Sequence, residues 1–179
     1  MARIQKKEKY SLFVRLLCLF QRWKYKRVLP PTYVWGYVPK LYLPFLKLGA
    51  AFRKKSSLDR KLKGYLMLYI SMFNECSFCV DLNASELLDM QEDTNKIQVL
   101  KQFETSKLFS EDEKCALTFC KKLLLKEAIT EDFFEGLKTR FSNEQIVEMT
   151  ALIGFQFFSS LFNSALDVQS FDFCNLDLK

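Results

Sequence analysis

The strongest constraint on the fold of this chain is that no proline occurs after Pro44. Proline ends or kinks a helix, and apolar residues recur with helical spacing along this proline-free stretch. No segment alternates strictly between apolar and polar residues, as a half-buried strand does. With 179 residues, the chain is long enough for one domain with a sizeable core. We therefore predict a single all-α domain.

Capping residues predict where the helices begin. Capping boxes at Ser110–Glu113 and Ser142–Gln145 open two helices, the first of which is expected to reach residue 126. Ser56-Ser57 is expected to cap a helix over 58–73, and Pro30-Pro31 to end the first helix of the chain. Further helices are expected at residues 10–20, 40–52, 76–90, 95–103 and 130–138.

Charge is divided unevenly along the chain. Residues 1–63 contain 17 Lys and Arg against 2 acidic residues, a net charge of +15. Residues 64–179 contain 10 against 19, a net charge of −9, and the two sum to +6. In one interpretation, the basic half pairs with the acidic half, within the molecule or across an oligomer interface. In the other, it binds an anionic surface, with membrane phospholipid favoured over nucleic acid.

The basic residues include a leader at residues 1–27, which also contains the apolar segment Tyr10–Phe20. This segment has about half of the ~20 residues that a transmembrane helix needs, and no small-residue cleavage site follows it. Two interpretations stay open. The segment is either an amphipathic helix that lies on a membrane surface or a helix docked on a partner subunit.

Cys76 and Cys79 form a Cys-x-x-Cys pair at the start of a predicted helix. Two sulfurs at this spacing lie on one helix face, close enough to form a disulfide. A thiol near a helix N-terminus is biased toward the reactive thiolate. The pair is therefore a redox centre, half of a zinc site, or a structural remnant. Zinc would need two further ligands in a chain without His, so we expect no metal and no cofactor.

The residues around this pair, Tyr69 to Asn83, resemble the alkylhydroperoxidase D-like / carboxymuconolactone decarboxylase family. The resemblance continues through residues 109–117, 141–150 and 162–166, which are similar to later helices of that family. It implies an oligomeric helical bundle over residues 30–179, trimeric or hexameric, preceded by a basic aromatic extension at residues 1–29. It also implies that Cys79 attacks a small hydroperoxide or disulfide, that Cys76 resolves the product, and that an external dithiol reduces the pair.

Two positions depart from the pattern of this family. The family has a His four positions after the second Cys and a Glu twelve positions before the first, described as the relay that deprotonates the attacking thiol. Here these positions are Asn83 and Gly64. Asn83 cannot take a proton, but we expect it to hydrogen-bond the sulfur of Cys79, one helical turn away. Glu75 is either a substitute base or a helix N-terminal residue favoured by the dipole, and we favour the second.

Two further residues beside the pair carry structural expectations. Gly64 interrupts an apolar helix, which indicates either close helix packing or space for a ligand above the thiols. Tyr65, Tyr69 and Phe78 would line such a space, and most of these aromatic side chains are expected to belong to the core. Asp81 is expected to face away from the cysteines into solvent.

These observations predict a thiol-dependent peroxidase or disulfide oxidoreductase that is slow because its relay is missing. The alternative is a non-catalytic member of the family that binds a membrane or protein through its basic N-terminal extension. The six Cys lack the density of a secreted disulfide framework. We therefore expect a cytoplasmic protein, or one that is peripheral at a membrane.

Overall fold

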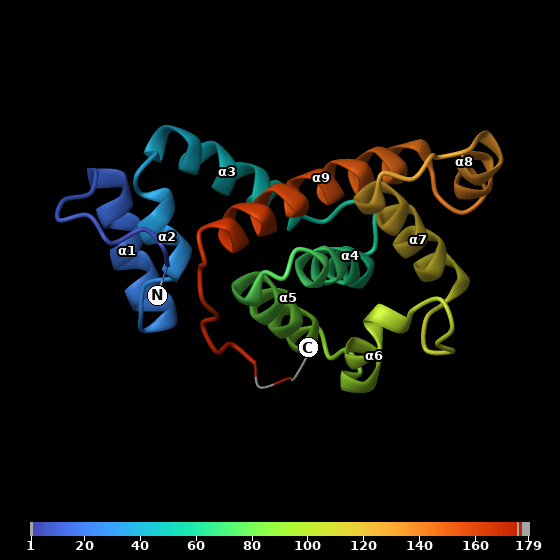
Figure 1. Cartoon of the computed structure of the whole chain (residues 1–179), viewed down its shortest axis with the longest axis horizontal. Helices are drawn as coiled ribbons and strands as arrows, with labels where there is room; N and C mark the ends of the chain where they lie inside the picture. The colour runs from blue at the N-terminus through green and yellow to red at the C-terminus, as the bar shows by residue number, and fades with distance from the viewer. Residues whose placement is uncertain (1, 175, 177–179) are drawn as a thin grey trace.

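The computed structural model describes residues 2–174 and 176 of the chain. These residues form helices and no strand, which confirms the all-α prediction. The elements are α1 (Leu12–Tyr25), α2 (Pro30–Trp35), α3 (Pro39–Phe52), α4 (Arg60–Phe73), α5 (Ser77–Asp89), α6 (Thr94–Gln98), the 3₁₀ turn η1 (Leu100–Gln102), α7 (Glu111–Leu125), α8 (Glu131–Lys138) and α9 (Asn143–Ala165). Figure 1 shows α9 along one side of the bundle, with α8 at one end and α1 and α2 beyond the other.

The central helix of the bundle is α4. Its side chains Tyr65, Leu66, Leu68 and Ile70 are fully buried, because α4 is apolar on most sides and packs against α5, α7 and α9. Burial of each such side chain contributes about 2 kcal/mol. By length and composition alone, α9 is also apolar enough to span a membrane. In this fold its buried face packs against α4.

Helix starts agree with the sequence where a full capping box is present. Both predicted boxes form, at Ser110 for α7 and at Ser142 for α9. The expected cap of α4 is wrong: Asp59 caps this helix, and its Oδ1 accepts from the backbone N–H of Leu62 at 2.9 Å. A carboxylate near the helix N-terminus gains from the helix dipole as well as from the hydrogen bond.

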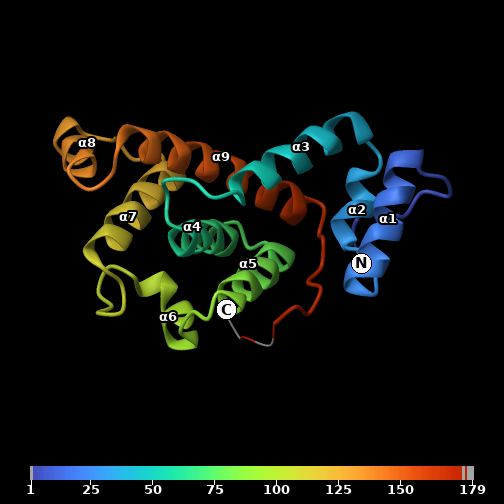
Figure 2. The same cartoon turned by 180° about the vertical axis from the view of Figure 1, so that it is seen from behind.

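The first three helices share one apolar cluster. Figure 2 shows that α3, the last of the three, extends from α2 to the bundle. The expectation that Pro30-Pro31 ends the first helix is wrong, because α1 ends at Tyr25 and is followed by Lys26 in the left-handed conformation. Pro30 instead opens α2, a position where its missing N–H costs nothing. Buried Gln21 accepts hydrogen bonds from the Leu29 amide at 3.1 Å and the Thr32 hydroxyl at 2.9 Å. The bond from Thr32 crosses residue 29, the expected end of the extension.

Gly64 lies on the side of α4 that packs against Leu87 of α5. A Cβ at this position would lie 2.7 Å from Cδ2 of Leu87, so no side chain fits unless the Leu87 side chain shifts. The glycine therefore serves close helix packing. The alternative expectation, a ligand space lined by Tyr65, Tyr69 and Phe78, is wrong, because these rings pack separately against Phe109, Phe103 and Phe173.

Candidate functional site

Cys76 and Cys79 form a disulfide at the first turn of α5, with their Cα atoms 5.2 Å apart. Cys76 is the N-cap of the helix, and its sulfur accepts a hydrogen bond of 3.2 Å from the backbone N–H of Cys79. Both sulfurs therefore lie at the positive end of the helix, where a thiolate is stabilised. The disulfide joins the two cysteines whose three-residue spacing predicted it.

Glu75 does not belong to this helix. It lies in the loop between α4 and α5, exposed and in the left-handed conformation with φ of 50°. The expectation that Glu75 is an N-terminal residue of the helix is therefore wrong, because Cys76 is the N-cap and Glu75 precedes it. An exposed carboxylate outside the helix is poorly placed to take a proton from a buried thiol.

The disulfide is buried, with Cys76 1% and Cys79 3% exposed. Two distant parts of the chain cover it, namely α2 through Val34 and the segment that follows α9, residues 167–174, through Val168 and Phe171. We call residues 167–174 the C-terminal strap. A reagent can reach either sulfur only when this apolar cover moves.

The hydrogen bond to Cys79 comes from an unexpected residue. Asn163, on α9, donates from Nδ2 to the sulfur of Cys79 at 3.3 Å. Asn163 is itself 3% exposed, and its Oδ1 has no hydrogen-bond partner among the described residues. A buried amide placed against a sulfur, with its acceptor otherwise unsatisfied, is held there by the packing of the helix.

Asn83 serves a different network. Its Nδ2 donates to Ser71 Oγ at 2.9 Å and to the carbonyl of Met67 at 3.3 Å, both on α4. Gln156 of α9 donates to the same hydroxyl at 2.8 Å. The expectation that Asn83 binds the sulfur of Cys79 is therefore wrong, because Asn83 faces α4 and fastens α5 to it.

Asp81, expected in solvent, is 6% exposed and holds the C-terminal strap. Its carboxylate accepts from the backbone amides of Phe171, Phe173 and Cys174 at 2.9–3.0 Å, and from the Ser170 hydroxyl at 2.9 Å. Burial by itself raises the pKa of Asp81, but these hydrogen bonds outweigh it and the pKa is lowered. The charged carboxylate thus fixes the strap over the disulfide two residues away.

The other described thiols are poor nucleophiles. Burial raises the pKa of Cys120 to about 12. It also raises the pKa of Cys18, Cys115 and Cys174 from the ordinary thiol value. These thiols are protonated at neutral pH, so among the described residues Cys76 and Cys79 are the candidates for thiol chemistry. No group of three or more Cys, Asp and Glu is placed to hold a metal within the described residues.

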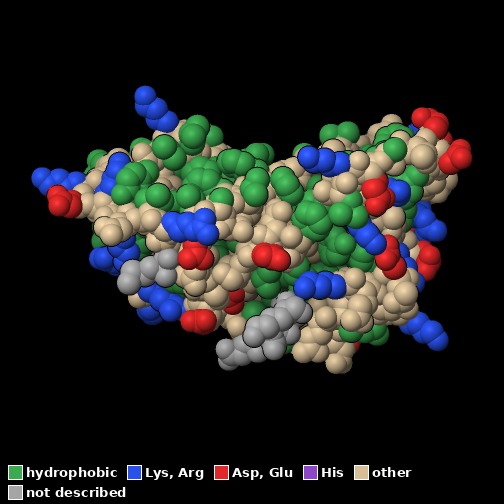
Figure 3. Space-filling model, in the orientation of Figure 1, with side chains coloured by type: hydrophobic (Ala, Val, Ile, Leu, Met, Phe, Trp, Pro, Cys, Tyr) green, Lys and Arg blue, Asp and Glu red, His purple; other side chains and the backbone are tan. Residues whose placement is uncertain are grey.

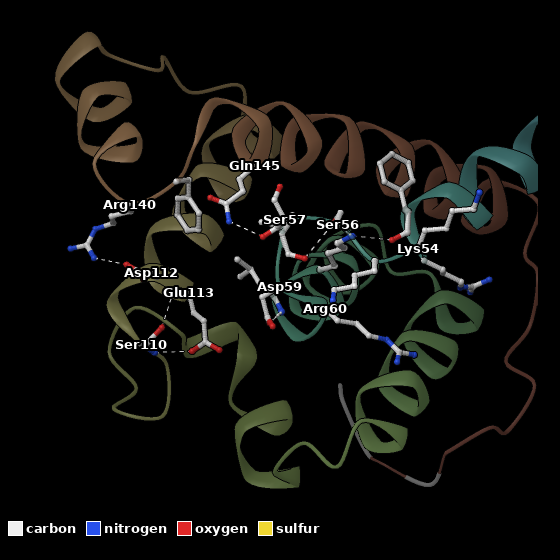
Figure 4. Close-up of a pocket in the computed structure, with 17 residues that line it drawn as sticks. Lys54, Ser56, Ser57, Asp59, Arg60, Ser110, Asp112, Glu113, Arg140 and Gln145 are labelled. Atoms are coloured by element: carbon white, nitrogen blue, oxygen red, sulfur yellow. Dashed lines mark hydrogen bonds and ion pairs between the residues drawn. The ribbon is translucent and has the colours of Figure 1, made fainter.

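A large cleft lies far from the disulfide. It has a volume of about 740 Å³ and is lined by the 53–60 loop and by the starts of α4, α7 and α9. Figure 4 shows its polar side chains, many of which bond one another: Gln145 with Ser57, Arg140 with Asp112, and Glu113 with Ser110. The cleft is at the first turn of α4 and the disulfide follows its last turn, about 20 Å away.

Comparisons with known proteins agree with this fold. The chain is 30% identical over 176 residues to the uncharacterised protein YnjA of Escherichia coli strain K12, which covers 96% of this chain and 95% of that protein. YdfG of Bacillus subtilis strain 168, also uncharacterised, is 24% identical over 104 residues, 57% of this chain and 71% of that protein. No family model matches the sequence.

Solved structures with the same fold include an alkylhydroperoxidase AhpD core, that of an uncharacterised peroxidase-related protein from Ralstonia eutropha JMP134. It has a TM-score of 0.83 at 18% identity, over 96% of this chain and 93% of that chain. The debrominase Bmp8 has a TM-score of 0.74 at 20% identity, over 94% and 90% of the two chains. At these identities the likeness is one of fold.

Proposed function

This chain belongs to the alkylhydroperoxidase D-like family, and from that premise we propose that it is a thiol-dependent peroxidase or disulfide oxidoreductase. The reacting groups are Cys79 and Cys76. The observation that carries the proposal is the disulfide at the first turn of α5, with Asn163 donating to the sulfur of Cys79. The other described thiols have raised pKa values, and no side-chain amide of the described residues donates to them.

The proposed cycle uses two thiols and an external dithiol. The Cys79 thiolate attacks the outer oxygen of a small hydroperoxide, the O–O bond breaks, and an alcohol leaves after taking a proton. The sulfenic acid on Cys79 then condenses with the thiol of Cys76, which releases water and forms the disulfide seen here. A dithiol reductant restores both thiols and is itself oxidised to a disulfide.

The rate of this cycle is limited by thiolate formation, because the usual base is absent. The chain contains no His, Asn83 is engaged with Ser71, and Glu75 lies outside the helix. What remains is the N-terminus of α5, worth about 1 kcal/mol, and the amide of Asn163, worth about 1.5 kcal/mol. A positioned general base contributes roughly 10²–10⁴-fold, so we expect slow turnover that rises with pH.

The experiment is thiol counting by mass spectrometry after peroxide is added to the reduced protein. We expect loss of two thiols, assigned to Cys76 and Cys79, and their recovery with a dithiol. In Cys76→Ser, Cys79 should be trapped by dimedone as a sulfenic acid, because no neighbouring thiol condenses with it. Cys115→Ser is the matched control and should behave as the unaltered chain. Oxidation of Cys115 or Cys174 while the pair stays alkylatable would overturn the proposal.

A further inference from the structure

The first helix has two apolar faces, and only one of them is used within the molecule. Val14 is fully buried, and Phe13 and Leu17 pack with it against Trp35 and Tyr42. The opposite face carries five large exposed side chains, which we call the α1 stripe: Leu12 (69% exposed), Leu16 (57%), Leu19 (59%), Phe20 (51%) and Trp23 (75%). Their spacing places all five on one side of the helix.

Cations border this stripe. Helical spacing places Arg15 and Arg22 along one edge of the stripe and Lys24 along the other, and all three are exposed. The helix contains no acidic residue, and Glu8 is the one acid in residues 1–58. Figure 3 shows hydrophobic side chains gathered over the end of the molecule that holds α1–α3, with Lys and Arg around them.

The structure also bears on the charge asymmetry of the chain. The ion pairs of the described residues involve acids of the bundle and cations from Arg53 onward, for example Lys63–Glu148 at 2.6 Å and Lys96–Glu113 at 2.8 Å. Within the part of the chain that the structure describes, no Lys or Arg of residues 2–52 forms an ion pair. Some of these cations contact carbonyls or aromatic rings of the same chain, as Arg27 does at Phe171, but no carboxylate of the described residues neutralises their charge.

We propose that the α1 stripe binds the surface of an anionic phospholipid bilayer. An exposed apolar face with Trp and Phe, bordered by cations, is the pattern of a helix that lies in the plane of a membrane interface. Its Lys and Arg meet the negative surface potential of such a membrane. At 14 residues, α1 is about 21 Å long, too short to cross the hydrocarbon core, so it lies on the surface.

A second copy of this chain fits the stripe less well. Its partner face would have to offer acidic side chains around an apolar groove. Many of the bundle acids instead neutralise lysines of their own chain, and the described apolar groove between α3 and α9 is lined by Trp35, Pro44, Phe155 and other apolar residues without a charge. The lipid proposal does not rest on the redox proposal, since the stripe and the disulfide lie on separate parts of the fold.

The test uses vesicle flotation and tryptophan fluorescence of the full chain. The chain has two Trp, and Trp35 is 2% exposed while Trp23 is 75% exposed, so a change in emission reports on the stripe. With phosphatidylcholine vesicles that contain phosphatidylglycerol, we expect flotation and a blue shift that weaken as salt is added. With phosphatidylcholine alone, we expect binding that is at least roughly tenfold weaker.

Two double variants separate the contribution of apolar contact from that of the bordering charge. Leu16→Ser with Leu19→Ser removes apolar contact, and Arg15→Glu with Arg22→Glu reverses the bordering charge. Each pair should lower binding roughly tenfold or more. Val147→Ser, at an equally exposed apolar position on α9, is the matched control and should bind normally.

Three outcomes would overturn the proposal. The first is the absence of binding to phosphatidylglycerol vesicles, and the second is equal binding to both vesicle types. The third is a stable oligomer in light scattering that Leu16→Ser with Leu19→Ser dissociates, which would assign the stripe to a second copy. Circular dichroism of each variant checks that the fold is kept, which is expected because every altered side chain is exposed.

Discussion

Asn163 donates a hydrogen bond of 3.3 Å to the sulfur of Cys79, although 84 positions separate the two residues in the sequence. The bond links the C-terminal end of α9 to the first turn of α5. A side-chain amide can stabilise a thiolate without taking a proton. In a chain without His, this amide and the helix N-terminus are the groups that the fold directs at Cys79.

The first prediction concerns the pKa of Cys79 in a Cys76→Ser background, where no disulfide forms. Asn163→Ala should raise this pKa by about one unit, since a hydrogen bond to a charged group contributes about 1.5 kcal/mol. The measurement is the pH dependence of alkylation by iodoacetamide. Asn83→Ala removes a similarly buried amide that bonds Ser71 and should leave the pKa unchanged. A shift with Asn83→Ala but none with Asn163→Ala would contradict the assignment.

The second prediction concerns the C-terminal strap. Asp81→Ala removes the acceptor for three backbone amides and the Ser170 hydroxyl, so the strap should open more often. We expect dithiothreitol to reduce the disulfide at least roughly tenfold faster, because a single hydrogen bond to a carboxylate is worth about 1.5–3 kcal/mol and opening breaks several. Asp89→Ala, at an exposed position of the same helix, is the control. An unchanged rate in Asp81→Ala would show that the strap does not limit access.

The third prediction concerns the lost relay position. Gly64→Glu should lower the stability of the protein by several kcal/mol, because a Cβ would lie 2.7 Å from Cδ2 of the fully buried Leu87. Adding Leu87→Ala should recover part of the loss by making room. Thermal unfolding followed by circular dichroism measures both. If Gly64→Glu were as stable as the unaltered chain, the close contact between α4 and α5 would not be what requires glycine.

The fourth prediction concerns the ion pair Lys63–Glu148, whose side chains are 8% and 18% exposed. Burial raises the pKa of Glu148, but the hydrogen bonds from Lys63 and Ser56 outweigh it and the pKa is lowered. The stability that this carboxylate contributes is therefore fully present above its ordinary value of 4.5, and is lost as the pH falls through the lowered pKa. In urea unfolding, Glu148→Gln should lose less stability on acidification than the unaltered chain.

For the same ion pair, removing one partner and replacing both partners should have different effects on stability. At pH 7, Glu148→Gln should cost about 3 kcal/mol, because Lys63 would stay buried without its counter-ion. Replacing both residues, with Lys63→Met and Glu148→Leu, should restore stability to within about 1 kcal/mol. A double variant no more stable than Glu148→Gln would show that the pair itself is required.

The fifth prediction is the homo-oligomer that the family resemblance implies. Leu41 (62% exposed), Leu48 (50%) and Phe158 (51%) line an apolar groove between α3 and α9 that is suited to a second copy. Leu48→Asp with Phe158→Asp should therefore lower the mass measured by light scattering at micromolar concentration to that of one chain. A monodisperse monomer before substitution would contradict the oligomer.

Several features of this protein follow from the sequence through short-range rules. The capping boxes at Ser110 and Ser142 and the apolar spacing behind them predict α7 and α9, because a cap and its helix interact within one turn. The disulfide follows from the three-residue spacing of Cys76 and Cys79 at a helix start for the same reason. The resemblance to the alkylhydroperoxidase D-like family is likewise carried by short contiguous motifs, such as Tyr69 to Asn83.

The environment of the disulfide was decided by tertiary structure. Asn83 and Asn163 are both buried amides on helices beside the pair, and their side chains do not indicate which one will reach the sulfur. That choice depends on how α4, α5 and α9 rotate as they pack, which directs Asn83 to Ser71 and Asn163 to Cys79. From the sequence, Asp81 is likewise expected at the surface, and its burial depends on contact with the C-terminal strap about 90 positions away. Local rules act within a turn of helix, whereas such contacts form only when distant segments share one core.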